Sequence, residues 1–506
     1  VESWLRRGRI HNRLALNAAL TLVLLLPLAI LSAGTAELVA AGSGPGGPCP
    51  AGTPLKTYAV QAIDVDIPLN RFGDHDPTGK MYVLDDRVDD VRSQESSRHV
   101  SIGLRDDAIQ PLVIRANVGD CVEIDFTNDA SGGDYGMHID GLAFDTEASG
   151  DAVGENTSSA VSRGERRTYR FFVPDAAELE GNHYIRPGPG MRNAVSHGLF
   201  GALVVEPEGS TYHTMDTLEP VESGWEAVIR PGSGKKAFRE YVKLHHEVGD
   251  EQFDISDSRG GKLPRVDPHT ESYRPGSRAI NYRSEPFMNR FDGPASSAKE
   301  KAHGYSSYVF GDPATPTPRG YVGDPTKIRI LHTGTEVFHV YHLHGGGIRW
   351  RLNPHADPTY DYQDTGLRKH PVEDAQSSRL DSQAFGPGES YDLEIEGGAG
   401  GVQQGAGEFL FHCHIVEHYV SGMWGFWRVF DTRQPHLAAL PDRAARPEAV
   451  DSAGLIGRTM PDGTTLTKDN LDAWIRPQLP PQGVPAGVKD ATVWDWRIDA
   501  ADPDRP

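Results

Sequence analysis

Basic side chains are scarce in this chain of 506 residues, which has 50 lysines and arginines against 71 aspartates and glutamates. The net charge of -21 gives a surface that repels nucleic acid and anionic lipid, so no nucleic acid is expected as a partner. The same surface tolerates cationic substrates, metal ions included. Cysteine is scarcer still, with three residues, which excludes a scaffold of many disulfides. Glycine and proline number 56 and 37, as suits a turn-rich β protein.

Residues 1–48 are predicted to be a signal peptide or membrane anchor followed by a linker. Four arginines within the first 13 residues precede an uncharged stretch from Leu14 to Ala36, which is the layout of a signal peptide. Because this stretch is long for a signal core, a retained membrane anchor is the alternative. In both cases the body of the protein is expected to be exported, to the cell envelope or the extracellular space.

Residues 412–423, with the sequence HCHIVEHYVSGM, hold the strongest chemical signal of the chain. Cys413, His418 and Met423 follow one another at intervals of five residues. A thiolate, an imidazole and a thioether on one loop are the soft ligands that a type 1 (blue) copper prefers. Zinc also binds clusters of Cys and His, but its sites rarely use an axial methionine. The segment therefore predicts a mononuclear copper site.

A second segment, residues 338–345 (FHVYHLHG), supplies the missing ligands. Neighbouring residues of a strand point to opposite faces, so His339 lies on one face and His342 and His344 on the other. By the same rule, the two imidazoles that flank the cysteine point away from it. The type 1 copper is predicted to bind His339, Cys413, His418 and Met423. A second metal site is predicted to be lined by His342, His344, His412 and His414.

The two remaining cysteines, Cys49 and Cys121, are expected to form a disulfide, because an exported protein meets an oxidising compartment. In the chain-entropy model, a bridge that closes a loop of this size contributes on the order of 4 kcal/mol to stability. Two free buried thiols are the alternative.

The body of the chain contains an internal repeat of strand-like segments with alternating apolar and polar residues. Each copy has a V-G-D turn before a strand, then a histidine-containing segment, a glycine-containing turn and a closing strand. The repeat predicts two β-sandwich domains, at 49–208 and 239–432, joined by a linker at 209–238. Residues 251–319, rich in glycine, proline, serine and charge, are predicted to be an insertion in the second domain, and residues 433–506 a C-terminal extension.

In its two metal motifs, and in the segment GLFGALVVEP at 198–207, the chain resembles the multicopper oxidases over roughly residues 50–432. The resemblance implies an all-β fold of two cupredoxin-like Greek-key sandwiches, as in the two-domain, small-laccase-like members. It implies copper as the cofactor and a homotrimer in which the copper cluster lies between subunits. It also implies an electron path from the type 1 copper through Cys413 to His412 and His414.

The first copy departs from the family pattern, in which eight histidines in four His-x-His pairs hold a type 2 copper and two type 3 coppers. His138 is kept, and by correspondence it shares the type 2 copper with His342, but Asp140 stands where its partner histidine belongs. The positions of the other pair hold Arg186 and Gly188 or, with the strand shifted, Ile185 and Pro187. An arginine beside a cationic cluster opposes copper binding unless an anion such as Asp140 pairs with it.

These patterns predict an oxidoreductase that takes single electrons from a small-molecule or metal-ion donor and reduces dioxygen at a histidine-ligated copper centre. Two alternatives stay open. One is a non-oxidase blue-copper electron-transfer or copper-binding protein, which the broken motifs of the first copy favour. The other is a nitrite-reductase-like enzyme with a reduced cluster, in which Asp140 beside His138 acts as the proton donor.

Overall fold

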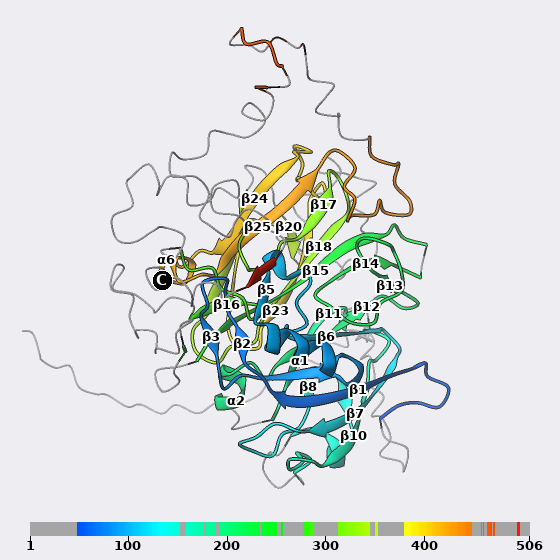
Figure 1. Cartoon of the computed structure of the whole chain (residues 1–506). Helices are drawn as coiled ribbons and strands as arrows, with labels where there is room; N and C mark the ends of the chain where they lie inside the picture. Colours follow the sequence, from blue (N-terminus) through cyan, green and yellow to red (C-terminus); the bar gives the residue numbers. More distant parts are fainter. Residues whose placement is uncertain are drawn as a thin grey trace, which may run out of the picture. The chain divides into compact units, whose positions relative to one another are not determined.

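The computed structural model describes most of residues 48–447 (Figure 1). Within this span the residues outside the description are 152–157, 177–178, 189–191, 233, 250–254, 257–276, 288–311, 345–349 and 353–378. Beyond residue 447, only short pieces between 457 and 495 are described. The predicted signal peptide or anchor thus lies outside the described residues. Among the helices that the structure does describe, none has the length and apolar character needed to cross a membrane.

The first copy of the repeat folds as a sandwich of two sheets that share one hydrophobic core. One sheet has five strands, in the order β4 (Lys80–Leu84), β1 (Leu55–Asp64), β7 (Cys121–Asn128), β10 (Arg166–Phe172) and β9 (Ala143–Phe144). The other has four, in the order β6 (Leu112–Asn117), β12 (Gly201–Glu206), β11 (Gly181–Arg186) and β8 (His138–Ile139). In β7, Val122, Ile124 and Phe126 are buried and the residues between them are partly exposed, so strand alternation directs the apolar side chains into the core.

The second copy folds as a second sandwich, with its own core (Figure 1). Its larger sheet runs in the order β13 (Thr211–His213), β14 (Glu226–Arg230), β15 (Phe238–Glu247), β18 (Thr326–His332), β23 (Ser390–Ile395), β20 (Trp350–Leu352) and β21 (Arg379–Leu380), and β16 (Arg278–Ile280) pairs with β15. Its smaller sheet runs in the order β17 (Arg319–Tyr321), β25 (Trp424–Phe430), β24 (Gly407–Cys413), β19 (His339–Leu343) and β22 (Ser382–Phe385). The smaller sheet carries both metal motifs of the sequence.

The two sandwiches have the same strand topology. β1 lies parallel to β7 and β6 parallel to β12, as β15 lies parallel to β18 and β17 parallel to β25. In both sandwiches, antiparallel pairing links the closing strand to the histidine-bearing strand, through β12, β11 and β8 in the first and β25, β24 and β19 in the second. The predicted all-β fold of two cupredoxin-like Greek-key sandwiches is therefore confirmed.

Buried charges join the two sandwiches. The Arg329 guanidinium on β18 lies 2.5 Å from Glu240 of β15 and 2.9 Å from Glu206 of β12. Arg115 of β6 also pairs with Glu240, and the side chains of these residues have no exposed surface. Removing one partner of such a network leaves an uncompensated buried charge, which costs about 3–5 kcal/mol.

The segment predicted as a linker is part of the second sandwich. Within residues 209–238, β13 pairs with β14 and β14 with β15, because buried Tyr212, Ala227 and Ile229 pack together with Phe238 in a small apolar cluster. The C-terminal extension contributes β26 (Val493–Asp495), which pairs with β5 (His99–Ser101). Short elements complete the described fold: the strands β2 (Ile67–Pro68) and β3 (His75–Asp76), and the helices α1 (Val88–Ser97), α2 (Arg192–Ser196) and α6 (Val416–Val420).

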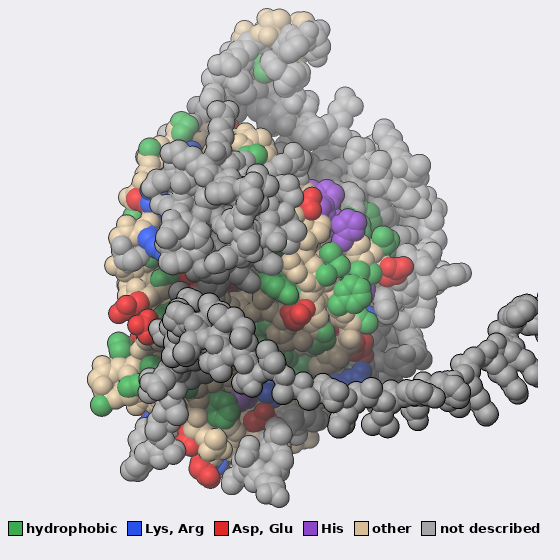
Figure 2. All heavy atoms as spheres, turned by 180° about the vertical axis from the view of Figure 1, so that it is seen from behind, with side chains coloured by type: hydrophobic (Ala, Val, Ile, Leu, Met, Phe, Trp, Pro, Cys, Tyr) green, Lys and Arg blue, Asp and Glu red, His purple; other side chains and the backbone are tan. Residues whose placement is uncertain are grey.

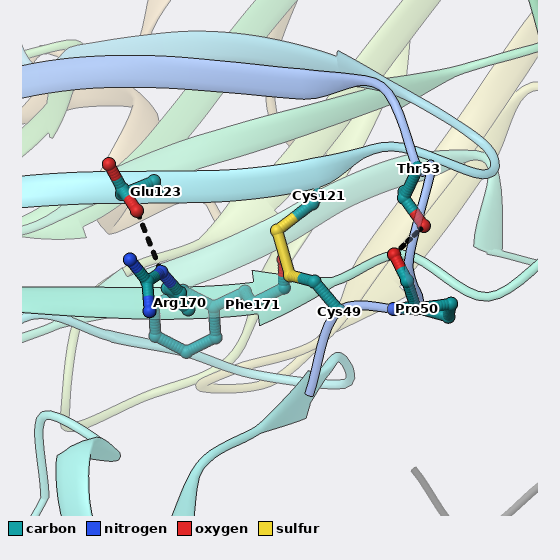
Figure 3. Close-up of a disulfide and its surroundings, with 7 residues drawn as sticks. All are labelled: Cys49, Pro50, Thr53, Cys121, Glu123, Arg170 and Phe171. Carbon is teal, nitrogen blue, oxygen red and sulfur yellow. Dashed lines mark hydrogen bonds and ion pairs between the residues drawn. A yellow bond between two sulfur atoms is a disulfide. The ribbon is translucent and has the colours of Figure 1, made fainter. Parts of the chain in front are cut away.

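The predicted disulfide between Cys49 and Cys121 is present (Figure 3). The bridge joins residues 72 positions apart and ties the segment before β1 to the first residue of β7. Arg170 of β10 pairs with Glu123 of β7 at 2.7 Å beside it. The disulfide therefore fixes the start of the first sandwich and leaves Cys413 as the free cysteine.

Candidate metal centres

Three predicted ligands of the type 1 copper converge in the core of the second sandwich. Cys413 Sγ lies 3.5 Å from His418 Nδ1 and 3.9 Å from His339 Nδ1, and the two Nδ1 atoms are 3.1 Å apart. All three side chains are buried. Met423, the fourth predicted ligand, is also fully buried, and its backbone carbonyl accepts a hydrogen bond from Cys413 N. One thiolate and two imidazoles that meet at one point fit a soft divalent metal such as copper.

The loop between Cys413 and Met423 is shaped by α6 and a glycine. α6 places His418 over the end of β24, and Gly422 then reverses the chain with a φ of 125°. A Cβ atom at Gly422 would collide with the Ser284 hydroxyl and lie 2.8 Å from Glu285 N. The sequence therefore needs glycine here to bring Met423 back beside the cysteine.

Burial sets the protonation of these ligands. It lowers the pKa of His339 to about 4 and that of His418 to about 3, and it raises the pKa of Cys413 to about 11. Both imidazoles are therefore neutral near pH 7 and ready to bind a metal, whereas the thiol must lose its proton when a metal binds. Val340 N, 3.4 Å from Cys413 Sγ, donates a hydrogen bond that stabilises the thiolate.

A carboxylate that was not predicted from the sequence lies beside this centre. Glu247 and His332 form with His339 a second group of buried, closely spaced ligand atoms, and Glu247 Oε1 lies 3.4 Å from His339 Nε2. Burial opposes ionisation of Glu247, but the hydrogen bond from His339 and nearby positive charge hold the pKa of this carboxyl below its ordinary value. The only sequence signal was a charged residue at the end of an otherwise strand-like segment.

A second cluster brings the ligand atoms of His342, His344 and His412 within 4.8 Å of one another, and the ring of the fourth predicted histidine, His414, lies beside them. His344 Nε2 and His412 Nε2 are 2.9 Å apart, and the ring centroids of His342 and His414 are separated by 5.0 Å. His342 Nδ1 donates to the Asp381 carbonyl at 2.7 Å, so that its Nε2 is left for a metal. His344 and His414 are exposed, and Figure 2 shows histidine side chains open to the surface beside apolar ones. The arrangement fits an imidazole-rich copper site at the surface.

The two centres are connected through β24. His412 Nδ1 donates a 2.8 Å hydrogen bond to the carbonyl of Cys413, in addition to the peptide bond between the two residues. Burial lowers the pKa of His412 to about 4, so this imidazole is neutral near pH 7. A pocket of about 570 Å³ opens beside it, lined by His344, Glu408, Leu410, His412, Tyr419 and Phe426. A small molecule therefore has access to the histidine cluster.

The matching positions of the first sandwich carry an ion-pair network. Arg186 of β11 lies opposite His138 of β8, as His412 lies opposite His342, so Arg186 and not Ile185 occupies the position of a histidine. Arg186 Nε is 3.1 Å from Asp140, and Asp140 is 3.3 Å from His138 Nε2. Burial opposes ionisation of Asp140, but the hydrogen bond from His138 and the charge of Arg186 lower the pKa of this carboxyl. Asp140 thus pairs with Arg186, which is the condition that the sequence set for an arginine at this position.

His138 does not join the histidines of the second sandwich within one chain. Among the described residues, the groups whose ligand atoms lie within 4.8 Å of one another do not include it. Its Nδ1 is hydrogen-bonded to the Ser149 carbonyl at 2.6 Å, and its Nε2 faces Asp140. The type 2 site predicted from His138 and His342 is therefore not formed among the described residues of one chain.

Comparisons with known proteins find similarity over parts of the chain. Residues 89–210 match the family model of multicopper oxidases. A probable nitrite reductase-hydroxylamine oxidoreductase fusion protein of Kuenenia stuttgartiensis is 23% identical over 63% of this chain and 27% of that protein. L-ascorbate oxidase of Cucumis sativus is 31% identical over 22% of this chain and 19% of the enzyme. The chain thus spans about a quarter or less of the length of these relatives.

Solved structures give weaker likenesses. A multicopper oxidase aligns with a TM-score of 0.42 and 17% identity over 74% of this chain and 89% of its own. The copper nitrite reductase of Nitrosomonas europaea aligns with a TM-score of 0.44 and 15% identity over 76% of this chain and 96% of its own. Residues 89–210 thus match the model of the family predicted from the sequence, and copper is the cofactor that the name of this family states.

Proposed function

We propose that this protein is a copper-dependent oxidase that passes single electrons from a small-molecule or metal-ion donor to dioxygen. The proposal rests on the end of β24, where two neighbouring residues contact two different groups of candidate copper ligands. Cys413 meets His339 and His418 in the core, while His412, its neighbour, meets His344 at a distance of 2.9 Å on the other side. A protein that used only a blue copper would not need the second group of imidazoles.

The residues have separate tasks in this proposal. Cys413, His339, His418 and Met423 would hold one copper, and His342, His344, His412 and His414 would hold the other centre. Copper at these positions would supply the one-electron chemistry that connects the donor to dioxygen. The backbone hydrogen bond between His412 and Cys413 gives a short connection, and burial of Cys413 excludes water from the thiolate. The pocket lined by His344 and His412 admits the oxidant.

The assembly and the location of the protein are part of the proposal. Within one chain the second sandwich supplies the clustered histidines His342, His344 and His412, and His138 lies outside this group. A homotrimer that brings the first sandwich of one subunit to the second sandwich of the next would add His138. We also propose export to the cell envelope or extracellular space, in line with the predicted signal peptide or anchor and the disulfide.

Copper counting, spectroscopy and oxygen uptake test the function together. The copper-loaded protein is expected to be blue, to contain more than one copper per chain, and to consume dioxygen with a phenolic dye or Mn(II) as donor. A His344→Ala variant should keep the blue absorption and lose oxygen uptake. A blue protein with one copper per chain and no oxygen uptake would contradict an oxidase.

A nitrite-reductase-like activity is the second candidate, because the first sandwich holds Asp140 against His138 in place of a second histidine. In such an enzyme Asp140 would supply the proton while the histidine cluster holds a single copper. Nitrite consumption by the copper-loaded protein with a reduced donor, abolished in Asp140→Asn, would favour this candidate. Oxygen uptake that is unaffected by Asp140→Asn would favour the oxidase.

A further inference from the structure

Glu247 is a buried carboxylate on the far side of His339 from the cysteine. The Nδ1 of His339 faces Cys413 and His418, whereas its Nε2 lies 3.4 Å from Glu247 Oε1. The Glu247 side chain is 3% exposed. Among the described residues, the buried His339 Nε2 makes no hydrogen bond of standard geometry, and the Glu247 carboxylate at 3.4 Å is the anion that it faces. The two nitrogens of one imidazole thus face different partners, the other candidate copper ligands on one side and an anion on the other.

Glu247 also fixes the loop that leads to His339. Its carboxylate accepts hydrogen bonds from Thr335 N at 3.1 Å and from Val337 N at 3.4 Å. These amides precede the first residue of β19, which is His339 itself. One carboxylate at the end of β15 therefore holds both the ring of His339 and the backbone before it.

A second metal ion at Glu247, His332 and His339 is the competing explanation, since these three ligand groups are also closely spaced. Both nitrogens of His332 are already used. Its Nε2 donates to the Val337 carbonyl at 2.5 Å, and its Nδ1 accepts from Gly334 N at 3.1 Å. His332 has no lone pair free for a metal. The three residues are therefore better explained as polar contacts around Glu247 than as a metal site.

We propose that Glu247 is a positioning residue of the type 1 copper site, where it accepts the Nε2–H of His339 and tunes the reduction potential. This inference rests on the proposed copper function. The hydrogen bond selects the tautomer whose Nδ1 lone pair points to the metal. A fixed negative charge one imidazole away favours the cupric over the cuprous state, and therefore lowers the potential. Arg278, opposite Glu247 in the register of β15 and β16, offsets part of that charge.

The test compares reduction potentials of the blue site in the full-length, copper-loaded protein. Glu247→Gln keeps the shape of the side chain and removes its charge. The equilibrium constant for reduction should shift at least tenfold toward the cuprous state, which is 59 mV for one electron. Glu247→Asp keeps the charge but moves it away from the His339 ring, so the reduction potential should rise by less than in Glu247→Gln.

A matched control separates this effect from the loss of any buried carboxylate. Asp324 is 1% exposed and pairs with Arg239 in the same sandwich, so Asp324→Asn should lower stability without moving the potential. A blue Glu247→Gln protein with the parent's potential would overturn the inference and leave the proposed function intact. If that variant does not fold, an unshifted potential in Glu247→Asp would overturn it instead. A colourless parent protein would overturn both the function and the inference.

Discussion

The two sandwiches share their strand topology, yet equivalent positions carry different chemistry. Where β19 and β24 set His342 opposite His412, β8 and β11 set His138 opposite Arg186. In the second sandwich these positions form a cluster of imidazoles, and in the first they form an ion-pair network. The comparison teaches that the fold fixes where side chains meet, while the side chains decide whether a metal or a salt bridge occupies the place.

The largest effect is expected from removing the sulfur ligand. Cys413→Ser should abolish the blue absorption completely, because serine offers no thiolate to copper. The matched change in the first sandwich, His138→Gln, should leave that absorption intact, since His138 is hydrogen-bonded to Ser149 and Asp140. Optical spectra of both copper-loaded variants make the comparison. Loss of the blue band in His138→Gln would contradict the prediction that the copper site at Cys413 does not depend on the first sandwich.

The disulfide should matter to the first sandwich and not to the copper ligands. Replacing Cys49 and Cys121 by serine is expected to lower the free energy of unfolding by about 4 kcal/mol, through the larger entropy of the unfolded chain. Denaturant unfolding measures the loss. The blue absorption per folded molecule should stay unchanged, because the bridge joins β7 to the segment before β1. A variant that loses the blue band while still folded would show that the disulfide also affects the copper ligands.

Copper affinity at the cysteine site should depend on pH through one proton. The pKa values of His339 (about 4) and His418 (about 3) leave both imidazoles neutral, whereas that of Cys413 (about 11) keeps the thiol protonated. Affinity should therefore rise about tenfold per pH unit between roughly pH 5 and 10, or about 1.4 kcal/mol per unit. Competition with a cuprous chelator at several pH values measures the slope. A flat profile would mean that the thiol is already ionised.

The smallest effect is expected at the ion pair of the first sandwich. Because the pKa of Asp140 is lowered by folding, its stabilising contribution is present above the unfolded-state pKa and lost as pH falls through the folded one. Asp140 is partly exposed, so Asp140→Asn should cost about 1 kcal/mol or less at pH 7. The difference from the parent should vanish in acid. Unfolding curves of the parent and Asp140→Asn at pH 7 and in acid measure this difference. A difference that grows in acid would mean that the ionised Asp140 does not stabilise the fold.

Strand alternation explains why the sequence predicted the metal centres of the second sandwich. His339, His342 and His344 divide between two faces by parity alone, and the structure brings each to the predicted neighbours. In the first copy the sequence left two registers open, because GNHYIRPGPG lacks a His-x-His pair to mark its face and its one histidine, His183, lies outside the candidate positions. Only the pairing of Arg186 with His138 decides between them.

Glu247 could not be predicted from the sequence for a different reason. It lies in β15, a strand with Arg239, Glu240, Lys243 and two histidines that reads as half-exposed, yet all ten of its residues are buried. Contacts with other strands bury these polar side chains, as when Glu240 meets Arg115 of the first sandwich. Such partners are distant in sequence, and no local sequence pattern indicates them.

The most direct test of the account is the optical spectrum of the purified chain after loading with cupric ions. An intense blue absorption is expected from copper bound to the Cys413 thiolate, and it should be absent in Cys413→Ser. A colourless protein that has taken up copper would contradict it, because the metal would then lie on the histidines alone.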